Sequence, residues 1–466
     1  MHPRFRWAFE GIDLSRRRGV APSAVQLLTL SFLALIALGT TGLLVLPGLY
    51  AGPRLSLVDA LFTATSAVCV TGLIVVDTAT YFTPLGKAWV ALLIQLGGLG
   101  ILTIATAVIV AMGRQPGLSV HESVGQQATQ RSMPWIRRLL RSVVVLTLTA
   151  ELCGALILWL RWGPLFGWGR ALGHAVFHAV SAFCNAGFST FSDSLVGFRG
   201  DPLTLGTVAV LIVCGGLGFV VFADLWWRYV RRGTRRLGLH ATLVLSTTAV
   251  LVIGATILFY AFESGTTLAD LPVVDRLSNA VFMAVTPRTA GFNTVNYDAV
   301  SDPSLVLTVF LMIIGGSPGS TAGGIKTTTV ALLALLFLSY LRGRRYVSIR
   351  GRTVPSEIVN LATGVVVAGV IILATAVFLL MLSEVSPETT DRAVLVRAGF
   401  EAVSAFGTVG LSMGQTATLT AAGKLVITFL MFLGRVGPLT LAAAMAIAGR
   451  RRRIHYRHAH ETVIVG

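Results

Sequence analysis

The chain has 466 residues, of which 54% are hydrophobic and only 12% charged, and its mean hydropathy is +0.79. Soluble domains carry about 25% charged residues, so this composition excludes a soluble globular protein and indicates an integral membrane protein. The formal net charge of +17 does not indicate a nucleic acid as partner, because the basic residues are not interleaved with aromatic side chains on a soluble module.

Eight apolar stretches are long enough to cross a bilayer, which takes roughly 20 residues. In chain order they cover residues 24–46, 86–111, 139–160, 203–226, 240–262, 305–340, 358–382 and 424–448. The first follows an arginine-rich tail and has full spanning length, so we expect a membrane span there and no cleavable signal.

The placement of charged residues predicts the orientation of the chain. Five clusters of basic residues fall on one side of an eight-span topology, at 4–18, 114–141, 228–236, 342–352 and 450–457. The opposite loops carry acids such as Asp77, Asp193 and Asp298. By the positive-inside rule, both termini are expected in the cytoplasm.

A glycine hairpin follows every other apolar stretch, after a short amphiphilic segment. The hairpins cover residues 69–73, 184–188, 288–292 and 407–411, one in each quarter of the chain. This period is far longer than that of a solenoid repeat and suits one pore unit per quarter. One chain is therefore predicted to supply a whole ring.

The segments before the hairpins are too short to cross a bilayer. A phenylalanine stands ten residues before the hairpin glycine in three quarters, as Phe62, Phe177 and Phe400, and nine residues before it in the third, as Phe282. Each segment predicts a re-entrant half-helix ending at the glycine. The carboxyl end of a helix carries partial negative charge, so four such ends near the membrane centre favour a cation.

These features predict an ion selectivity filter. A filter replaces the water around an ion with carbonyl oxygens, and the backbone conformations required, often with φ above zero, cost glycine no steric strain. Tight helix packing is the alternative role for a membrane glycine, but it does not explain four glycines in register. The predicted filter residues are Val70, Thr71, Gly72, Asn185, Ala186, Gly187, Thr289, Ala290, Gly291, Thr408, Val409 and Gly410.

The sixth apolar stretch contains ten residues that cannot form a continuous helix, because Gly costs about 1 kcal/mol and Pro about 3 kcal/mol in a helix interior. They are Gly315, Gly316, Ser317, Pro318, Gly319, Ser320, Thr321, Ala322, Gly323 and Gly324. A phosphate-binding loop is not favoured, because Ile325 interrupts the Gly-Lys-Thr core and no strand precedes it. No nucleotide is therefore expected on this chain.

Several ionisable residues lie in apolar surroundings. Lys326 and Arg435 are functional candidates by default, because a charge is costly at membrane depth. We expect Arg435 to lie under the filter, as an electrostatic barrier or as a latch for the loop carbonyls. The acids Glu151, Asp224 and Glu401 are candidates too, with a structural role for each as the alternative.

Other polar residues in the pore segments have simpler interpretations. His174 and His178 are spaced as in a zinc helix, but no third ligand is evident, so packing and capping are preferred. Asp59 and Ser278 are expected to cap half-helices. Cys69 and Cys184 occupy matching positions before their glycines and are expected behind the hairpins.

Four segments carry a family resemblance, at residues 65–73, 288–294, 315–327 and 434–440. With them the chain resembles the Trk/Ktr/HKT superfamily of potassium transporters, and most of all its KtrB-like membrane subunits. The resemblance implies an intramembrane gate formed by residues 315–324 with Lys326 and Arg435. Plant sodium transporters of the superfamily commonly have serine at the first filter glycine, whereas this chain has Gly72, which favours K+ as the transported ion.

The resemblance also implies partners and a location. It predicts a homodimer in the lipid bilayer of a bacterial inner (plasma) membrane, docked on a cytoplasmic RCK-type nucleotide-binding regulatory subunit, a KtrA-like octameric ring. Nucleotides would act through that ring.

We therefore predict an all-α integral membrane protein with eight transmembrane helices, arranged as four helix–pore-loop–helix repeats around one pore. The predicted parts are the cytoplasmic tails 1–22 and 450–466 and pore repeats at 23–113, 138–236, 239–341 and 357–449. The predicted function is gated K+ uptake without enzymatic chemistry. A sodium-coupled or Na+-permeable transporter and an intramembrane enzyme using the histidines or Glu401 are the alternatives.

Overall fold

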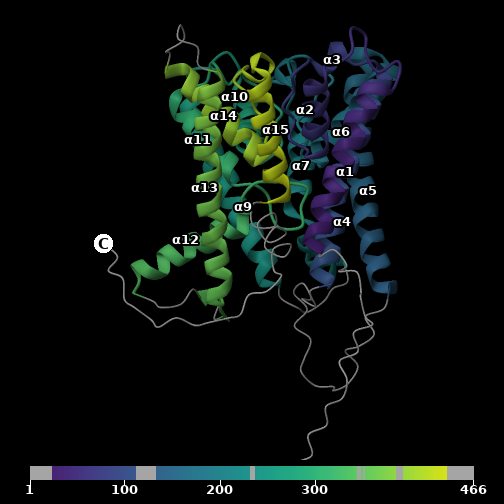
Figure 1. The fold of residues 1–466 in the computed structure, drawn as a ribbon. Helices are drawn as coiled ribbons and strands as arrows, with labels where there is room; N and C mark the ends of the chain where they lie inside the picture. Colours follow the sequence, from purple (N-terminus) through teal and green to yellow (C-terminus); the bar gives the residue numbers. More distant parts are fainter. Residues whose placement is uncertain are drawn as a thin grey trace, which may run out of the picture.

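The computed structural model describes residues 24–111, 133–230, 237–343, 348–349, 352–384 and 392–437. These residues are almost entirely helical (Figure 1). The predicted tails at 1–22 and 450–466, most of the predicted basic clusters and the end of the eighth apolar stretch lie outside the described residues.

The helices that flank the predicted half-helices are α1 (Ala24–Val45), α4 (Pro84–Ala111), α5 (Met133–Phe166), α7 (Pro202–Leu217), α9 (Leu239–Glu263), α11 (Asp302–Ile313), α12 (Thr327–Leu341), α13 (Ser356–Glu384) and α15 (Ala421–Val436). The predicted half-helices are α2 (Leu57–Val68), α6 (Trp168–Phe183), α10 (Val273–Val285) and α14 (Arg392–Gly407).

Short elements complete the described chain. They are α3 (Thr78–Tyr81), η1 (Val196–Phe198), α8 (Phe219–Leu225), the π-helical turn η2 (Trp226–Val230) and η3 (Thr416–Thr418). An antiparallel hairpin of two-residue strands, β1 (Ser348–Ile349) and β2 (Arg352–Thr353), follows α12.

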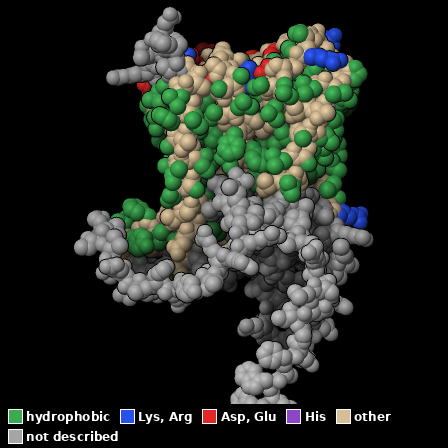
Figure 2. Space-filling model, in the orientation of Figure 1, with side chains coloured by type: hydrophobic (Ala, Val, Ile, Leu, Met, Phe, Trp, Pro, Cys, Tyr) green, Lys and Arg blue, Asp and Glu red, His purple; other side chains and the backbone are tan. Residues whose placement is uncertain are grey.

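Four helices in the described part of the chain are long and apolar enough to cross a membrane, or five if the bent pair α7 and α8–η2 counts as one span. Their outer surfaces are apolar. Val250 and Ile253 of α9 are 71% and 60% exposed, and Phe378 of α13 is 63% exposed. Figure 2 shows a broad hydrophobic band below an upper end where acidic and basic side chains gather. Such a band suits contact with lipid. The predicted count of eight spans stays a prediction.

The predicted fourth span is not straight. The helix breaks at Gly218, where φ is +83°, and the axis bends by 96° between α7 and α8–η2. The N–H of Phe219 donates to the carbonyl of Gly319 at 3.2 Å, outside the helix. The apolar stretch at 203–226 is therefore a bent pair of helices, and its glycines contact a distant loop.

The four half-helices lie in the upper half of the molecule (Figure 1), and their inner turns are buried. Ser56 is the N-cap of α2 and accepts a hydrogen bond from the Asp59 N–H at 3.1 Å, so Asp59 is not the cap itself. Pro272 precedes α10, and Ser278 lies inside that helix. Both predicted caps were therefore misplaced by a few residues.

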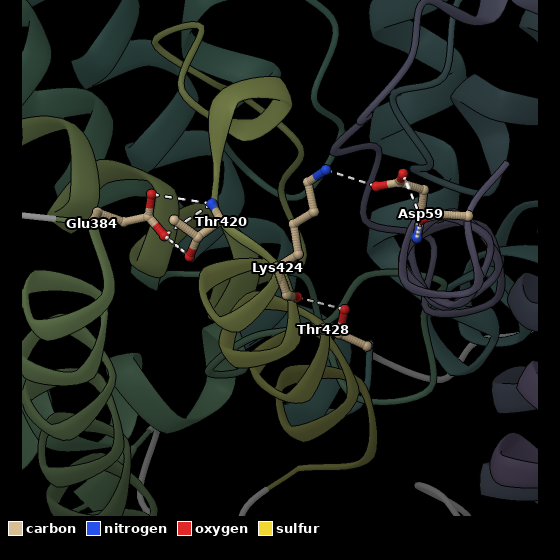
Figure 3. Close-up of polar contacts among 6 residues, drawn as sticks. Asp59, Glu384, Thr420, Lys424 and Thr428 are labelled. Atoms are coloured by element: carbon tan, nitrogen blue, oxygen red, sulfur yellow. Dashed lines mark hydrogen bonds and ion pairs between the residues drawn. The ribbon is translucent and has the colours of Figure 1, made fainter.

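Carboxylates tie the upper ends of the helices together. Glu263 at the end of α9 accepts from the Ser301 N–H at 3.0 Å, just before α11. Glu384 at the end of α13 accepts from the Thr420 hydroxyl at 2.6 Å, just before α15. Figure 3 shows this contact beside the ion pair of Lys424 with Asp59, whose N–O distance is 2.7 Å. That pair joins α15 to α2, and with it the last and first quarters.

Candidate functional site

All four hairpins adopt the same unusual backbone. Each glycine has positive φ: +93° at Gly72, +69° at Gly187, +78° at Gly291 and +90° at Gly410. The residue two positions earlier also has positive φ in every hairpin, namely Val70, Asn185, Thr289 and Thr408, at 51° to 72°. The predicted need for positive φ at the glycines is therefore met by the structure.

The second set of positive φ values was missed by sequence reasoning. Val and Thr are β-branched, and such residues are rare in the left-handed region because of steric strain. Three of the four positions carry one, and strain of this kind clusters at ligand sites. Only Asn185 belongs to a residue type that visits this region readily.

The four hairpins meet in a closed ring. A methyl group on Gly72 would lie 2.4 Å from the carbonyl oxygen of Ala186 and 3.0 Å from the Cα of Gly187. A methyl group on Gly187 would likewise lie 2.8 Å from the carbonyl oxygen of Ala290. The corresponding distances are 2.3 Å from Gly291 to the carbonyl oxygen of Val409 and 2.1 Å from Gly410 to that of Thr71. Each glycine thus faces the carbonyl that precedes the next glycine. The structure brings all four predicted hairpins together in one ring.

Buried hydroxyl groups hold the hairpins in shape. Ser66 donates to the carbonyl of Leu73 at 2.7 Å and accepts from the Gly72 N–H at 3.1 Å. Matching bonds run from Ser181 to Phe188 O at 2.8 Å, from Thr286 to Phe292 O at 2.5 Å, and from the Gly410 N–H to Ser404 at 3.1 Å. Sequence reasoning did not single these residues out, although a hydroxyl residue six positions before the glycine in three quarters, and five before it in the third, was a usable signal.

Cys69 and Cys184 are buried behind the first and second hairpins, as predicted. The Cys184 sulfur lies 3.5 Å from Gln95 Oε1 and 3.9 Å from Glu151 Oε1. Gln95 Nε2 donates to Glu151 Oε2 at 3.1 Å. Glu151 therefore takes part in a polar contact that links α4, α5 and the end of α6.

The predicted unwound segment separates α11 from α12. Its residues Ser317, Ser320 and Thr321 are buried, at most 1% exposed. The N–H groups of Ser317 and Thr321 donate to the carbonyls of Gly216 and Gly215 at 3.0 and 3.2 Å. The loop is thus fixed to the end of α7.

The same loop lies directly against two filter hairpins. The Thr321 hydroxyl donates to the carbonyl of Phe183 at 3.1 Å, at the end of α6. A methyl group on Gly323 would lie 2.1 Å from the hydroxyl oxygen of Thr408. Movement of this loop would therefore disturb the packing of the second and fourth hairpins.

Arg435 is 3% exposed and reaches two other quarters of the chain. Its guanidinium donates to the carbonyl of Thr321 in the loop, and to the carbonyl of Gly97 in α4 at 3.0 Å. Lys326 donates to the carbonyl of Ala322 at 2.6 Å. Both basic side chains thus donate to carbonyls of residues 315–324.

The histidines have structural partners. His178 Nε2 lies 3.0 Å from the Ser189 hydroxyl, and His174 Nδ1 lies 2.6 Å from the Thr190 hydroxyl. Both rings stack on Phe191, with centroids 4.9 Å apart in each pair. The described residues contain no cluster of three metal-ligating side chains. Packing is thus the role that the contacts support.

The remaining intramembrane acids contact nearby chain. Glu401 accepts from Ser412, and from Thr416 at 2.8 Å, in the segment after the fourth hairpin. Asp224 accepts from the N–H of Gly238. These contacts favour the structural alternative for both acids.

A helical protein with membrane-length apolar helices and short half-helices whose hairpins meet in a ring has an architecture suited to a membrane ion transporter. The family model "TrkH: Cation transport protein" matches residues 19–451. The chain belongs to this family. It is a family of membrane ion transporters, so the prediction that the chain is not an enzyme is confirmed.

Curated relatives align along almost the whole chain. The potassium/sodium uptake protein NtpJ of Enterococcus hirae is 37% identical over 446 residues, 95% of this chain and 97% of that protein. The Ktr system potassium uptake protein B of Vibrio alginolyticus is 38% identical over 443 residues, 95% of this chain and 94% of that protein. The predicted resemblance to KtrB-like proteins is confirmed.

A solved structure shows the same fold. The potassium transporter TrkH from Vibrio parahaemolyticus superposes with a TM-score of 0.73 at 19% identity, covering 94% of this chain and 87% of that one.

Proposed function

We propose that the chain is the pore-forming subunit of a bacterial potassium uptake system. The observation that carries this proposal is the closed ring of hairpin glycines, in which each glycine faces a carbonyl of its neighbour. K+ would exchange its hydration water for the carbonyls of residues 70–72, 185–187, 289–291 and 408–410. A filter built from backbone carbonyls is the solution that K+ channels use. No covalent step is needed.

The four quarters act as four pore repeats, at 23–113, 138–236, 239–341 and 357–449. In each, two outer helices flank a half-helix and its hairpin, giving eight spans around one pore. The recurring order of elements and the matching hairpin geometry support this division. Both termini would lie in the cytoplasm of a cell whose inner membrane holds the protein.

Residues 315–324 form the gate, with Lys326 and Arg435 as its latch. Support comes from the bond between Arg435 and the Thr321 carbonyl and from the contact of Gly323 with the fourth hairpin. In this proposal, the loop in its present position closes the path below the filter. A cytoplasmic ring of RCK-type nucleotide-binding subunits would release the loop, acting on a homodimer of this chain.

Growth and flux test the transport proposal. Expression in a bacterium lacking its own K+ uptake systems should restore growth at low external K+. Purified protein in liposomes should carry Rb+ at least about tenfold faster than Na+, since selectivity resides in the filter. Equal Na+ and Rb+ flux would refute the K+-selective filter.

A sodium-permeable transporter of the same family is the second candidate. It is favoured by the name of one relative, the potassium/sodium uptake protein NtpJ. All four hairpin glycines are present, which favours K+. Flux of 22Na+ that rises with external K+ would support Na+ coupling, whereas Na+ flux unaffected by K+ would oppose it.

A further inference from the structure

Arg288 is a buried cation without adequate partners. It stands at the start of the third hairpin, at the position that cysteine occupies in the first two. Arg288 is 7% exposed, and its Nε donates to no acceptor among the residues that the structure describes. Within the described residues, the one hydrogen bond of its guanidinium goes from a terminal nitrogen to the Thr248 hydroxyl of α9, at 3.4 Å. A guanidinium carries five N–H donors, so most of its capacity is unused.

No carboxylate in the described part of the chain forms an ion pair with Arg288. The contrast with Arg435 is direct, because that guanidinium binds two backbone carbonyls. A buried charge without a counter-charge or hydrogen bonds is strongly unfavourable. The surroundings of Arg288 therefore call for a ligand that accepts hydrogen bonds and carries negative charge.

A small pocket opens beside this guanidinium. Arg288 lines it together with Thr248, Val213 and Leu217 of α7, and Gly316 of the gate loop. The space it offers a water-sized sphere is about 10 Å³, so it suits a monatomic ligand better than a phosphate, a carboxylate or a lipid headgroup. A monatomic anion or a single water molecule remains, and the positive charge favours the anion.

We propose that this pocket binds one halide ion, chloride in the cell, held by the Arg288 guanidinium and the Thr248 hydroxyl. The bound anion offsets a positive charge that stands one residue before the third filter segment and would otherwise repel a cation there. Because Gly316 forms one wall, the occupied pocket also packs against the gate loop.

Bromide tests the site independently of transport. Crystals of the full-length protein grown in sodium bromide should show an anomalous peak next to Arg288 and Thr248. Arg288→Gln should abolish the peak. Thr248→Val keeps the charge but removes the hydroxyl, and it should weaken bromide affinity roughly tenfold, as for loss of one hydrogen bond to an ion. Thr256→Val is the matched control, because that hydroxyl donates to the Val252 carbonyl within α9.

Thermal unfolding in detergent gives a second measurement that does not depend on Arg288→Gln folding. The melting temperature of the wild type and of Thr256→Val should rise when gluconate is replaced by bromide at constant ionic strength, because a ligand that binds the native state stabilises it. Thr248→Val should lose most of this rise. Absence of the bromide peak in the wild type, or a rise that Thr248→Val retains in full, overturns the proposal. Neither result bears on K+ selectivity, so the transport proposal is tested separately.

Discussion

Replacing Gly72 by alanine tests the ring of hairpins most sharply. The new methyl group would lie 2.4 Å from the carbonyl oxygen of Ala186. Cβ atoms in proteins essentially never come closer than 3.0 Å to such a neighbouring atom. The oxygen must therefore retreat by at least about 0.6 Å, and by about 1 Å to reach a comfortable separation. In addition, φ of +93° is strained for alanine, by about 1–2 kcal/mol.

A matched control separates these two effects. Gly414 has φ of +81° but no atom within 4 Å of the position that a methyl group would take. Gly414→Ala therefore introduces the backbone strain without the collision. It should lower thermal stability by about 1–2 kcal/mol and leave ion selectivity unchanged.

The assay is Rb+ and Na+ flux in liposomes with equal amounts of monodisperse protein. We expect Gly72→Ala to reduce Rb+ flux at least about tenfold or to abolish its preference over Na+, since displacements near 1 Å are costly where geometry decides function. Wild-type flux and selectivity in Gly72→Ala would refute the ring. An equal loss in Gly414→Ala would assign the effect to strain and not to the ring.

Three further predictions follow from the contacts. Arg435→Gln should raise flux in the absence of a regulatory partner by roughly ten- to a hundredfold, because a charged hydrogen bond to the Thr321 carbonyl contributes about 1.5–3 kcal/mol; patch-clamp or liposome flux measures this. Ser66→Ala should destabilise the first hairpin by about 1–3 kcal/mol, through the unpaired Gly72 N–H, and lower Rb+/Na+ selectivity in the same flux assay. Asp59→Asn should lower stability by about 1 kcal/mol at neutral pH, and this difference should shrink as pH falls below the usual pKa of aspartate.

The pH dependence of the last variant has a defined sign. Burial raises the pKa of Asp59, but the hydrogen bonds from Lys424 and Ser56 outweigh it and hold that pKa below its usual value. A carboxylate with a depressed folded-state pKa stabilises the protein above its unfolded pKa and loses this contribution as pH falls through the folded value. Thermal unfolding of the wild type and of Asp59→Asn should therefore converge on acidification.

Each of these predictions has an outcome that contradicts it. For Arg435→Gln it is flux at or below the wild-type level in well-folded protein, with Arg435→Lys as the conservative comparison. For Ser66→Ala it is unchanged selectivity; Ser31→Ala in α1, which removes a hydroxyl bound to the Leu28 carbonyl, is the control. For Asp59→Asn it is a stability difference that does not shrink on acidification.

Much of the site could be predicted because glycine and proline leave clear local signals. The hairpin glycines and the unwound residues 315–324 stand where the structure has them, because glycine adopts positive φ without steric strain and because glycine and proline both disfavour a helix interior. The half-helices were found from their short length. In each case the information lies within a few residues of the feature.

Features that depend on distant contacts were not predictable. The helix breaks at Gly218, and the next residue, Phe219, donates its N–H to the distant carbonyl of Gly319. Nothing in the sequence of α7 distinguishes Gly218 from a glycine that only allows close helix packing. The left-handed conformation of Val70 runs against the preference of valine and is imposed by the ring. The ion pair of Asp59 with Lys424 joins residues at opposite ends of the chain.

The central claim is that backbone carbonyls of the four hairpins coordinate the transported cation. Anomalous diffraction from crystals of the protein in rubidium, which replaces K+, tests it directly. The account predicts a Rb+ peak inside the ring, within coordination distance of carbonyls from residues 70–72, 185–187, 289–291 and 408–410. An empty ring, with Rb+ bound by the carboxylates of Glu151 or Glu401 instead, would contradict it.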